Sequence, residues 1–278
     1  MNLHVIDTGF FKLDGGAMFG VVPKTIWQKT NPPDQNNLCT WAMRCMLMED
    51  GKQLILIDNG IGDKQDAKFL SHYYLHGNDS LIQSIHKAGF SEKDVTDMFL
   101  THLHFDHCGG GVKKSGEKFE LAFPNATYWS NEEHWLWATQ PNAREKASFL
   151  KENIFPMKES GHLKMVHQTE STPFPRMEIF YASGHTDMMM ILMIHYKGRT
   201  ICFLADLIPS SSHIPIPYVM GYDTRPLITM DEKDKFLKMA AANDYVLFFE
   251  HDPVIECATV RDVDGRIKLD KTFRLAEL

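Results

Sequence analysis

One short segment constrains this chain more than any other. It covers residues 101–110, reads THLHFDHCGG, and places four potential metal ligands within six residues in the pattern His-x-His-x-Asp-His. In an extended strand end, side chains two residues apart point the same way, so His102 and His104 can meet one metal ion. A turn then carries Asp106 and His107 toward another, and the paired glycines allow a tight exit. The segment therefore predicts a metal site at the end of a strand.

Three later stretches offer the additional ligands that a catalytic metal site takes from distant parts of a chain. His185, Asp206 and His251 each follow an apolar run that reads as a strand. Because functional side chains gather in the loops at strand ends, we expect these residues to line one edge of the sheets. Imidazole and carboxylate donors suit zinc, iron or manganese.

The order of predicted elements indicates an α/β protein. Strands are expected at 4–6, 41–48, 53–57, 97–101, 178–182, 188–196, 200–205, 245–249 and 259–263, and helices at 63–76, 79–87, 131–158 (interrupted by Pro141 and Pro156) and 231–242. Two strand-rich halves that each carry helices favour an αββα sandwich, with mixed sheets packed face to face and helices outside. The length of 278 residues fits a single domain spanning 1–278.

Composition narrows the possible partners. The net charge of −7 leaves no excess of Lys and Arg to neutralise a phosphate backbone, so we expect no nucleic-acid partner. Five scattered cysteines fit neither a disulfide framework nor a Cys-based zinc site, and they are expected to be reduced. No leader-like start and no run of about 18 apolar residues is seen in the sequence, which predicts a cytoplasmic protein without a membrane partner.

The motif and its distant partners resemble the metallo-β-lactamase superfamily, whose His-x-His-x-Asp-His pattern and later His, Asp and His they match in order. The resemblance implies two metal ions, most simply zinc, with manganese or iron as alternatives. It assigns His102, His104 and His185 to metal 1, Asp106, His107 and His251 to metal 2, and Asp206 to both as a bridge. The strand-ending Asp58 resembles a residue that orients the ligands without binding the metal itself.

A bridging aspartate narrows the choice within the superfamily. True β-lactamases generally lack it, whereas lactonases, methyl parathion hydrolases, glyoxalase II and RNase Z have it, and RNase Z should carry a basic arm that this acidic chain lacks. The chain is most similar to the lactonase and methyl parathion hydrolase group. The resemblance implies a hydrolase in which a hydroxide shared by two metals attacks a neutral ester or lactone carbonyl, with Asp106 or Asp206 relaying the proton.

One departure from the lactonases affects the expected substrate. They place a catalytic tyrosine three residues after the bridging Asp, where this chain has Pro209. We therefore expect short aliphatic homoserine lactones to be mediocre substrates. His213, Tyr218 and Tyr222 lie in the same loop and are candidates to replace the missing hydroxyl.

Other interpretations remain open at this level. The alternatives are a phosphotriesterase, a glyoxalase II-like thioesterase and a non-catalytic binding module in which metal has only a structural role. We expect a small, neutral, apolar substrate, no organic cofactor and a homodimer as a possible assembly. Apolar residues in loops or at strand ends either line a substrate cleft or simply pack; they are Phe19, Trp27, Phe105, Tyr218 and Met220. Lone histidines, His134 among them, are expected to be ordinary core or surface residues.

Overall fold

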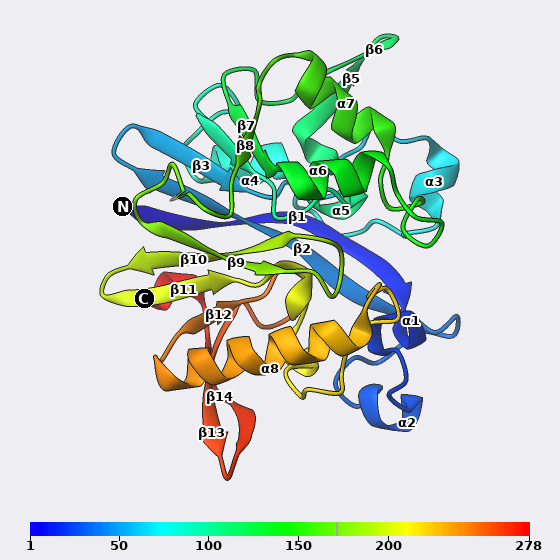
Figure 1. Cartoon of the computed structure of the whole chain (residues 1–278). Helices are drawn as coiled ribbons and strands as arrows, with labels where there is room; N and C mark the ends of the chain where they lie inside the picture. The colour runs from blue at the N-terminus through cyan, green and yellow to red at the C-terminus, as the bar shows by residue number, and fades with distance from the viewer. Residues whose placement is uncertain (171) are drawn as a thin grey trace. The chain divides into compact units, whose positions relative to one another are not determined.

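The computed structural model describes residues 1–170 and 172–278 (Figure 1). The chain divides into two compact units, each built from two stretches of sequence. Unit 1 contains Met1–Gly9 and Met43–Pro173, and unit 2 contains Phe10–Ala42 and Phe174–Leu278. Both units combine helices with a mixed sheet, so the predicted α/β class is confirmed.

The sheet of unit 1 has the strand order β1-β2-β3-β4-β7-β8. Its strands are β1 (Asn2–Asp14), β2 (Leu38–Asp50), β3 (Gln53–Ile57), β4 (Asp97–Phe99), β7 (Thr127–Asn131) and β8 (Leu163–Val166), and β1 and β2 continue into the residues of unit 2. The β2–β3 pair is antiparallel, whereas the β3–β4, β4–β7 and β7–β8 pairs are parallel. β3 and β4 are short and largely buried, as expected for central strands covered on both faces, whereas β8 is partly exposed.

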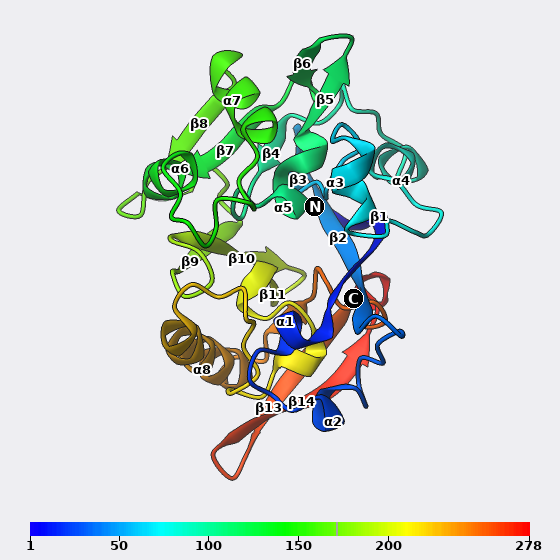
Figure 2. The same ribbon diagram turned by 90° about the vertical axis from the view of Figure 1, so that its right-hand side faces the viewer.

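Short helices follow the strands of unit 1. They are α3 (Ala67–Ser71), α4 (Leu81–Lys87), α5 (Phe105–Cys108), α6 (Glu132–Thr139) and α7 (Lys151–Glu159), with a 3₁₀ turn at Gly109–Gly111 and a small hairpin of β5 (Val112–Ser115) and β6 (Lys118–Leu121). Figure 2 shows α6 beside β7. The long helical region expected over 131–158 is thus two helices, and Pro156 lies inside the second one without ending it.

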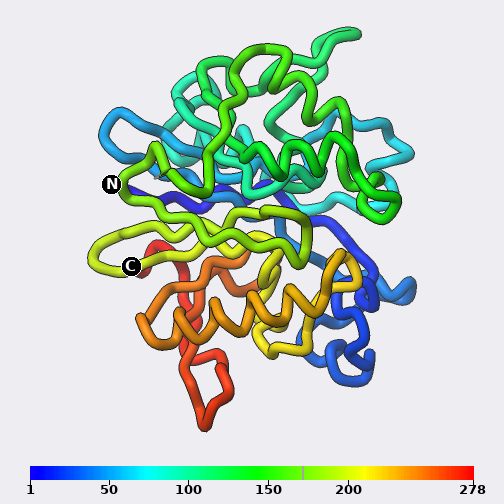
Figure 3. Tube along the Cα trace, in the orientation of Figure 1, coloured from blue at the N-terminus to red at the C-terminus, as the bar shows by residue number. Residues whose placement is uncertain are grey.

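The sheet of unit 2 has the order β14-β13-β12-β11-β10-β9. Its strands are β9 (Met177–Ala182), β10 (Met189–Tyr196), β11 (Arg199–Phe203), β12 (Val246–Phe248), β13 (Cys257–Val263) and β14 (Arg266–Phe273). Only the β11–β12 pair is parallel. The trace in Figure 3 shows the β13–β14 hairpin in red. All strands predicted in this half are present, and β14 is an addition.

Helices of unit 2 comprise α1 (Gly15–Phe19), α2 (Lys24–Trp27) and α8 (Pro226–Ala242), with 3₁₀ turns at Ala205–Leu207, Ser211–His213 and Leu275–Glu277. α8 contacts β13, and it begins at Pro226 instead of the expected Asp231. Proline suits this first position because its fixed φ matches the helix and its missing N–H needs no partner there.

Packing explains most of the apolar loop residues that were candidates for a substrate cleft. Phe19 is buried between Trp27, whose ring centroid lies 5.3 Å away, and His213, whose centroid lies 4.6 Å away, both in stacked orientation. Phe105 and Met220 are buried as well. The five cysteines are all buried free thiols, as expected. Among the described residues, none of the helices combines the length and apolar character that crossing a membrane requires.

Candidate metal centre

The His-x-His-x-Asp-His segment lies in unit 1 and runs from the loop after β4 into the short helix α5, which contains Asp106 and His107. It is held to the sheet by a hydrogen bond from the Leu100 N–H to the Trp129 carbonyl. His104 is the N-cap residue of α5, so the chain turns sharply between the second and third ligand candidates. All four candidates of the segment are buried, which removes competing water from their donor atoms.

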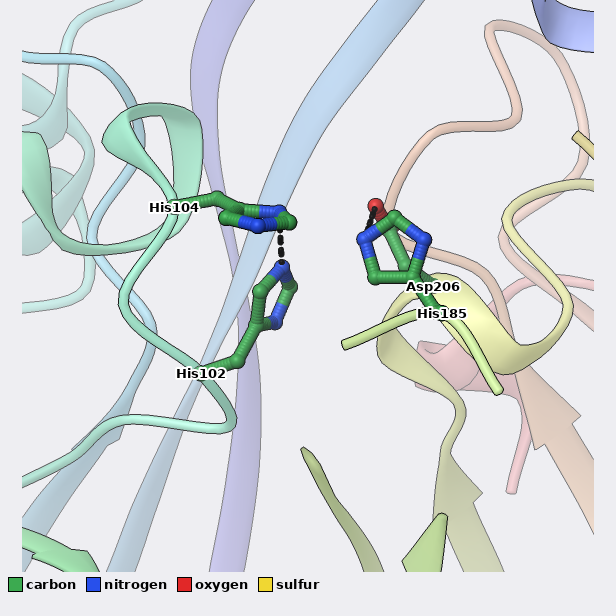
Figure 4. A group of neighbouring side chains, drawn as sticks. All are labelled: His102, His104, His185 and Asp206. Atoms are coloured by element: carbon green, nitrogen blue, oxygen red, sulfur yellow. Dashed lines mark hydrogen bonds and ion pairs between the residues drawn. The ribbon is translucent and has the colours of Figure 1, made fainter. Parts of the chain in front are cut away.

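His102 and His104 face each other through ring nitrogens. Nε2 of His102 lies 3.1 Å from Nδ1 of His104, and Figure 4 shows the two rings oriented edge to face. Two nitrogens bound to one tetrahedral zinc at about 2.05 Å each are separated by roughly 3.3 Å. The two rings are therefore spaced as neighbouring ligands of a single ion, and this donor pair fits a divalent transition metal.

Asp58 organises the opposite side of the motif from the end of β3. Its carboxylate accepts hydrogen bonds from the Thr101 N–H at 2.8 Å and the Thr101 hydroxyl at 2.6 Å, and it lies 3.0 Å from Nδ1 of His107. Nδ1 of His107 must therefore carry a proton, which leaves Nε2 as the bare nitrogen. That Nε2 lies 3.8 Å from the Asp106 carboxylate. The contact matches the orienting role expected for Asp58.

The same network sets the tautomer of His102. Its Nδ1 lies 3.1 Å from the Thr101 hydroxyl oxygen, whose own proton is donated to Asp58. The hydroxyl can then only accept from Nδ1, so Nε2 of His102 also has no proton.

Glycine is required where α5 continues into the 3₁₀ turn. A Cβ on Gly109 would collide with the backbone carbonyl of Ile61, and a Cβ on Gly110 would collide with that of Asn59. This close approach allows the Asn59 N–H to donate to the His107 carbonyl at 2.9 Å. The glycines thus let the loop after β3 lie directly against the ligand-bearing turn.

In unit 2, Asp206 lies between two histidines. One carboxylate oxygen is 3.1 Å from Nε2 of His185, and the other is 3.0 Å from Nε2 of His251 (the His185–Asp206 pair is drawn in Figure 4). Asp206 follows β11 in a 3₁₀ turn that begins at Ala205, a residue with a left-handed φ of 44°. The buried carboxylate of Asp206 therefore contacts both histidines at once, one through each oxygen.

Both histidines also contact an oxygen through Nδ1, the ring nitrogen that does not face Asp206. Nδ1 of His185 lies 2.9 Å from the Asp223 carboxylate, and Nδ1 of His251 donates to the Ala42 carbonyl at 2.8 Å. Burial lowers the pKa of His185, but the carboxylates of Asp206 and Asp223 outweigh this effect and raise it to about 10. These surroundings favour a positive charge at His185, as a cation site should.

The three residues that are candidates to replace the tyrosine absent at position 209 have different surroundings in the loop after Asp206. His213 is buried with Nδ1 2.8 Å from the Ser210 hydroxyl and Nε2 2.9 Å from the Met18 carbonyl. Burial lowers its pKa to about 3, so it is a neutral packing residue with both nitrogens engaged. Tyr218 is half-buried with its ring against Phe19, whereas Tyr222 is exposed. Pro209 itself accepts the His251 N–H through its carbonyl at 3.1 Å.

Two residues that contact the candidate ligands or the motif that carries them were not predicted from the sequence. Asp223 lies in an irregular loop, and nothing in its local pattern links it to His185. His134 was expected to be an ordinary residue, yet its Nε2 accepts the Leu103 N–H of the motif at 2.9 Å. Within each unit the predicted ligands do come together: His102, His104, Asp106 and His107 in unit 1, and His185, Asp206 and His251 in unit 2.

Buried histidines and carboxylates with outer partners that fix the ring orientations are suited to hold divalent metal ions, and metal-dependent hydrolases use sites of this kind. The model of the metallo-β-lactamase superfamily matches residues 44–251 of this chain. The chain therefore belongs to that superfamily and has its fold.

Its relatives include lactonases. N-acyl homoserine lactonase from Bacillus cereus is 21% identical over 234 residues, which are 80% of this chain and 84% of that protein. The structure of a probable metal-dependent hydrolase from Staphylococcus aureus is similar with a TM-score of 0.89 and 26% identity, over 98% of this chain and 96% of that one. AidC, a dizinc quorum-quenching lactonase, has the same fold with a TM-score of 0.78 and 24% identity, over 98% and 95% of the two chains.

Proposed function

We propose that this hydrolase cleaves a neutral ester or lactone with two divalent transition-metal ions, zinc being the expected metal. The observation that carries the proposal is Asp206, one of whose oxygens faces Nε2 of His185 while the other faces Nε2 of His251. A carboxylate that bound a single ion would need a histidine beside only one of its oxygens. The proposed ligands are His102, His104 and His185 for the first ion, Asp106, His107 and His251 for the second, and Asp206 for both.

The protein's own contribution is orientation and proton transfer. Divalent ions held by these residues would supply an activated water and polarise the substrate oxygen. Asp58, Asp223 and the Ala42 carbonyl keep Nδ1 of their histidines protonated, so that each Nε2 stays available to a metal. Our proposal gives Asp106 or Asp206 the role of taking the proton of the attacking water and returning it to the leaving oxygen.

Similarity to lactonases and the departure at position 209 together define the proposed substrate class. N-acyl homoserine lactonase is the activity named for the Bacillus cereus relative. Pro209 has no hydroxyl, and its carbonyl is engaged with the His251 N–H. Of the candidates to replace the hydroxyl, His213 has both nitrogens engaged, which leaves Tyr218 and Tyr222. We propose other lactones and aryl esters as better substrates than short aliphatic homoserine lactones.

Asp206→Asn tests the metal centre. The amide nitrogen of asparagine donates hydrogen bonds and does not bind a cation, so one side of the bridge is lost. We expect close to two metal ions per wild-type chain by elemental analysis and fewer in the variant. The fall in kcat/KM should exceed the roughly 100-fold typical of losing an outer-shell partner. Asp234→Asn, on the exposed face of α8, is the matched control and should keep both metals.

Comparing substrates tests the reaction. We would measure kcat/KM for other lactones, aryl esters, phosphotriesters and short homoserine lactones, where each tenfold ratio corresponds to about 1.4 kcal/mol of transition-state binding. Other lactones or aryl esters should give the highest kcat/KM. A clear preference for phosphodiesters or glutathione thioesters would overturn the assignment, and a wild-type stoichiometry that stays at one after reconstitution would overturn the dinuclear centre.

A further inference from the structure

Glu145 is a buried acid beside the metal-binding motif. It lies in the connection between α6 and α7, and its Oε1 is 3.4 Å from Nε2 of His104. Phe149 packs on the same histidine with ring centroids 4.8 Å apart. The connection is tied to the motif by a hydrogen bond from the Phe105 N–H to the Ser148 carbonyl at 3.0 Å. Glu145 is thus fixed against the far side of His104 from His102.

The orientation of the Glu145 carboxylate is determined by its other partners. Its Oε2 accepts hydrogen bonds from Nε1 of Trp137 at 2.7 Å and from Nδ2 of Asn142 at 2.6 Å. The Asn142 amide cannot be turned around, because its Oδ1 accepts the backbone N–H groups of Arg144 at 2.8 Å and Glu145 at 3.1 Å. Oε2 therefore faces two obligatory donors, and Oε1 is the atom directed at His104.

His104 is the exception among the candidate histidine ligands. His102, His107, His185 and His251 each have Nδ1 engaged by a neighbouring oxygen and present Nε2. His104 instead directs Nδ1 toward Nε2 of His102, and its Nε2 points away toward Glu145. To bind a metal through Nδ1, His104 needs its proton on Nε2, and a carboxylate is a suitable acceptor for that proton.

We infer that Glu145 is the positioning residue that keeps the proton on Nε2 of His104 and so reserves Nδ1 for the metal. This inference rests on the proposed function, in which His104 is a ligand of the first ion. Trp137 and Asn142 serve it indirectly, since they hold Oε2 and thereby aim Oε1.

Glu145→Gln separates this role from simple packing because the two side chains have nearly the same shape. Trp137 and Asn142 both donate, so the glutamine oxygen must take the place of Oε2. The amide NH₂ then faces Nε2 of His104 and favours an unprotonated Nε2 with the proton on Nδ1. A proton on Nδ1 faces the bare Nε2 of His102, which makes a stable hydrogen bond in the position that a metal ion would occupy.

Two measurements on the full chain test the inference. In ¹⁵N-histidine NMR of the metal-free protein, wild type should show a protonated Nε2 at His104, and Glu145→Gln should lose that signal. In chelator competition with Zn²⁺, the variant should bind one ion roughly 10- to 100-fold more weakly while the second ion is little affected. Glu120→Gln, on the exposed strand β6, should behave as wild type in the NMR experiment.

Each outcome bears on a separate claim. If Glu145→Gln retains the Nε2 proton and the wild-type zinc affinity, Glu145 has no positioning role, although the proposed function stands. If wild type binds no zinc, the proposed function fails, while the NMR comparison still decides whether Glu145 sets the tautomer. A variant that loses stability but keeps the NMR signal would show a purely structural role and would also overturn the inference.

Discussion

Asp58→Ala removes the acceptor that joins β3 to the metal-binding motif. The carboxylate is fully buried and meets three donors: the Thr101 N–H, the Thr101 hydroxyl and Nδ1 of His107. Each buried donor left without a partner costs about 1–3 kcal/mol, and a water entering the vacated space can meet one of them. Two donors then stay unsatisfied, so we expect the free energy of unfolding to fall by about 2–6 kcal/mol, a large part of the 5–15 kcal/mol typical of a folded domain.

Urea denaturation of the metal-free protein is the appropriate assay, because a chelator removes any contribution from ligand binding. The midpoint should drop while the slope with urea stays constant. Asp58→Asn is the matched control: its oxygen can still accept the Thr101 N–H, so it should lose much less stability, although its amide faces Nδ1 of His107 and should weaken metal binding. An alanine variant within 1 kcal/mol of wild type would falsify this account of Asp58.

Two further predictions concern residues beside the ligands. Burial keeps the pKa of His213 near 3 in the folded chain against about 6.5 when unfolded, so the unfolded state binds the extra proton between these values and stability should fall as pH drops from 6.5 to 3. His213→Asn should reduce this slope by up to about 1.4 kcal/mol per pH unit in denaturation series, and an unchanged slope would contradict the role of burial. Gly109→Ala should cost about 1–3 kcal/mol by thermal unfolding and weaken zinc binding, because its Cβ meets the Ile61 backbone. Gly116→Ala meets open space but strains a backbone with a φ of 63°, so it is the comparison for zinc affinity alone; equal zinc affinity in both variants would count against the close approach.

The positions of most proposed ligands were predictable because they follow an apolar strand. The motif after β4, Asp206 after β11 and His251 after β12 all lie where a run of buried residues ends. Asp58 had the same signal at the end of β3. A strand pattern and a metal-binding residue type at its end are both local properties of sequence, so together they mark these positions.

The partners that orient the ligands were not predictable in the same way. Asp223 and Glu145 lie in irregular connections, where neither periodicity nor spacing fixes the direction of a side chain. β14 was missed because most of its residues are exposed and polar, and it is defined by pairing with β13. The predicted start of α8 lies after the observed start, because Pro226 was not considered as the first residue of the helix. Tertiary contacts decide all of these features.

Unit 2 is discontinuous in sequence, and this affects how the chain matures during synthesis. Residues 10–42 are made first but belong with residues 174–278, so their partners are translated last. Phe11, Trp27 and Trp41, all buried in the finished protein, have no completed core to enter until the second segment emerges. At synthesis rates of about 5–20 residues per second, the roughly 130 residues between the segments correspond to several seconds or more of delay. Apolar side chains exposed during that interval favour aggregation, so we expect the yield of folded protein to depend on translation speed and growth temperature.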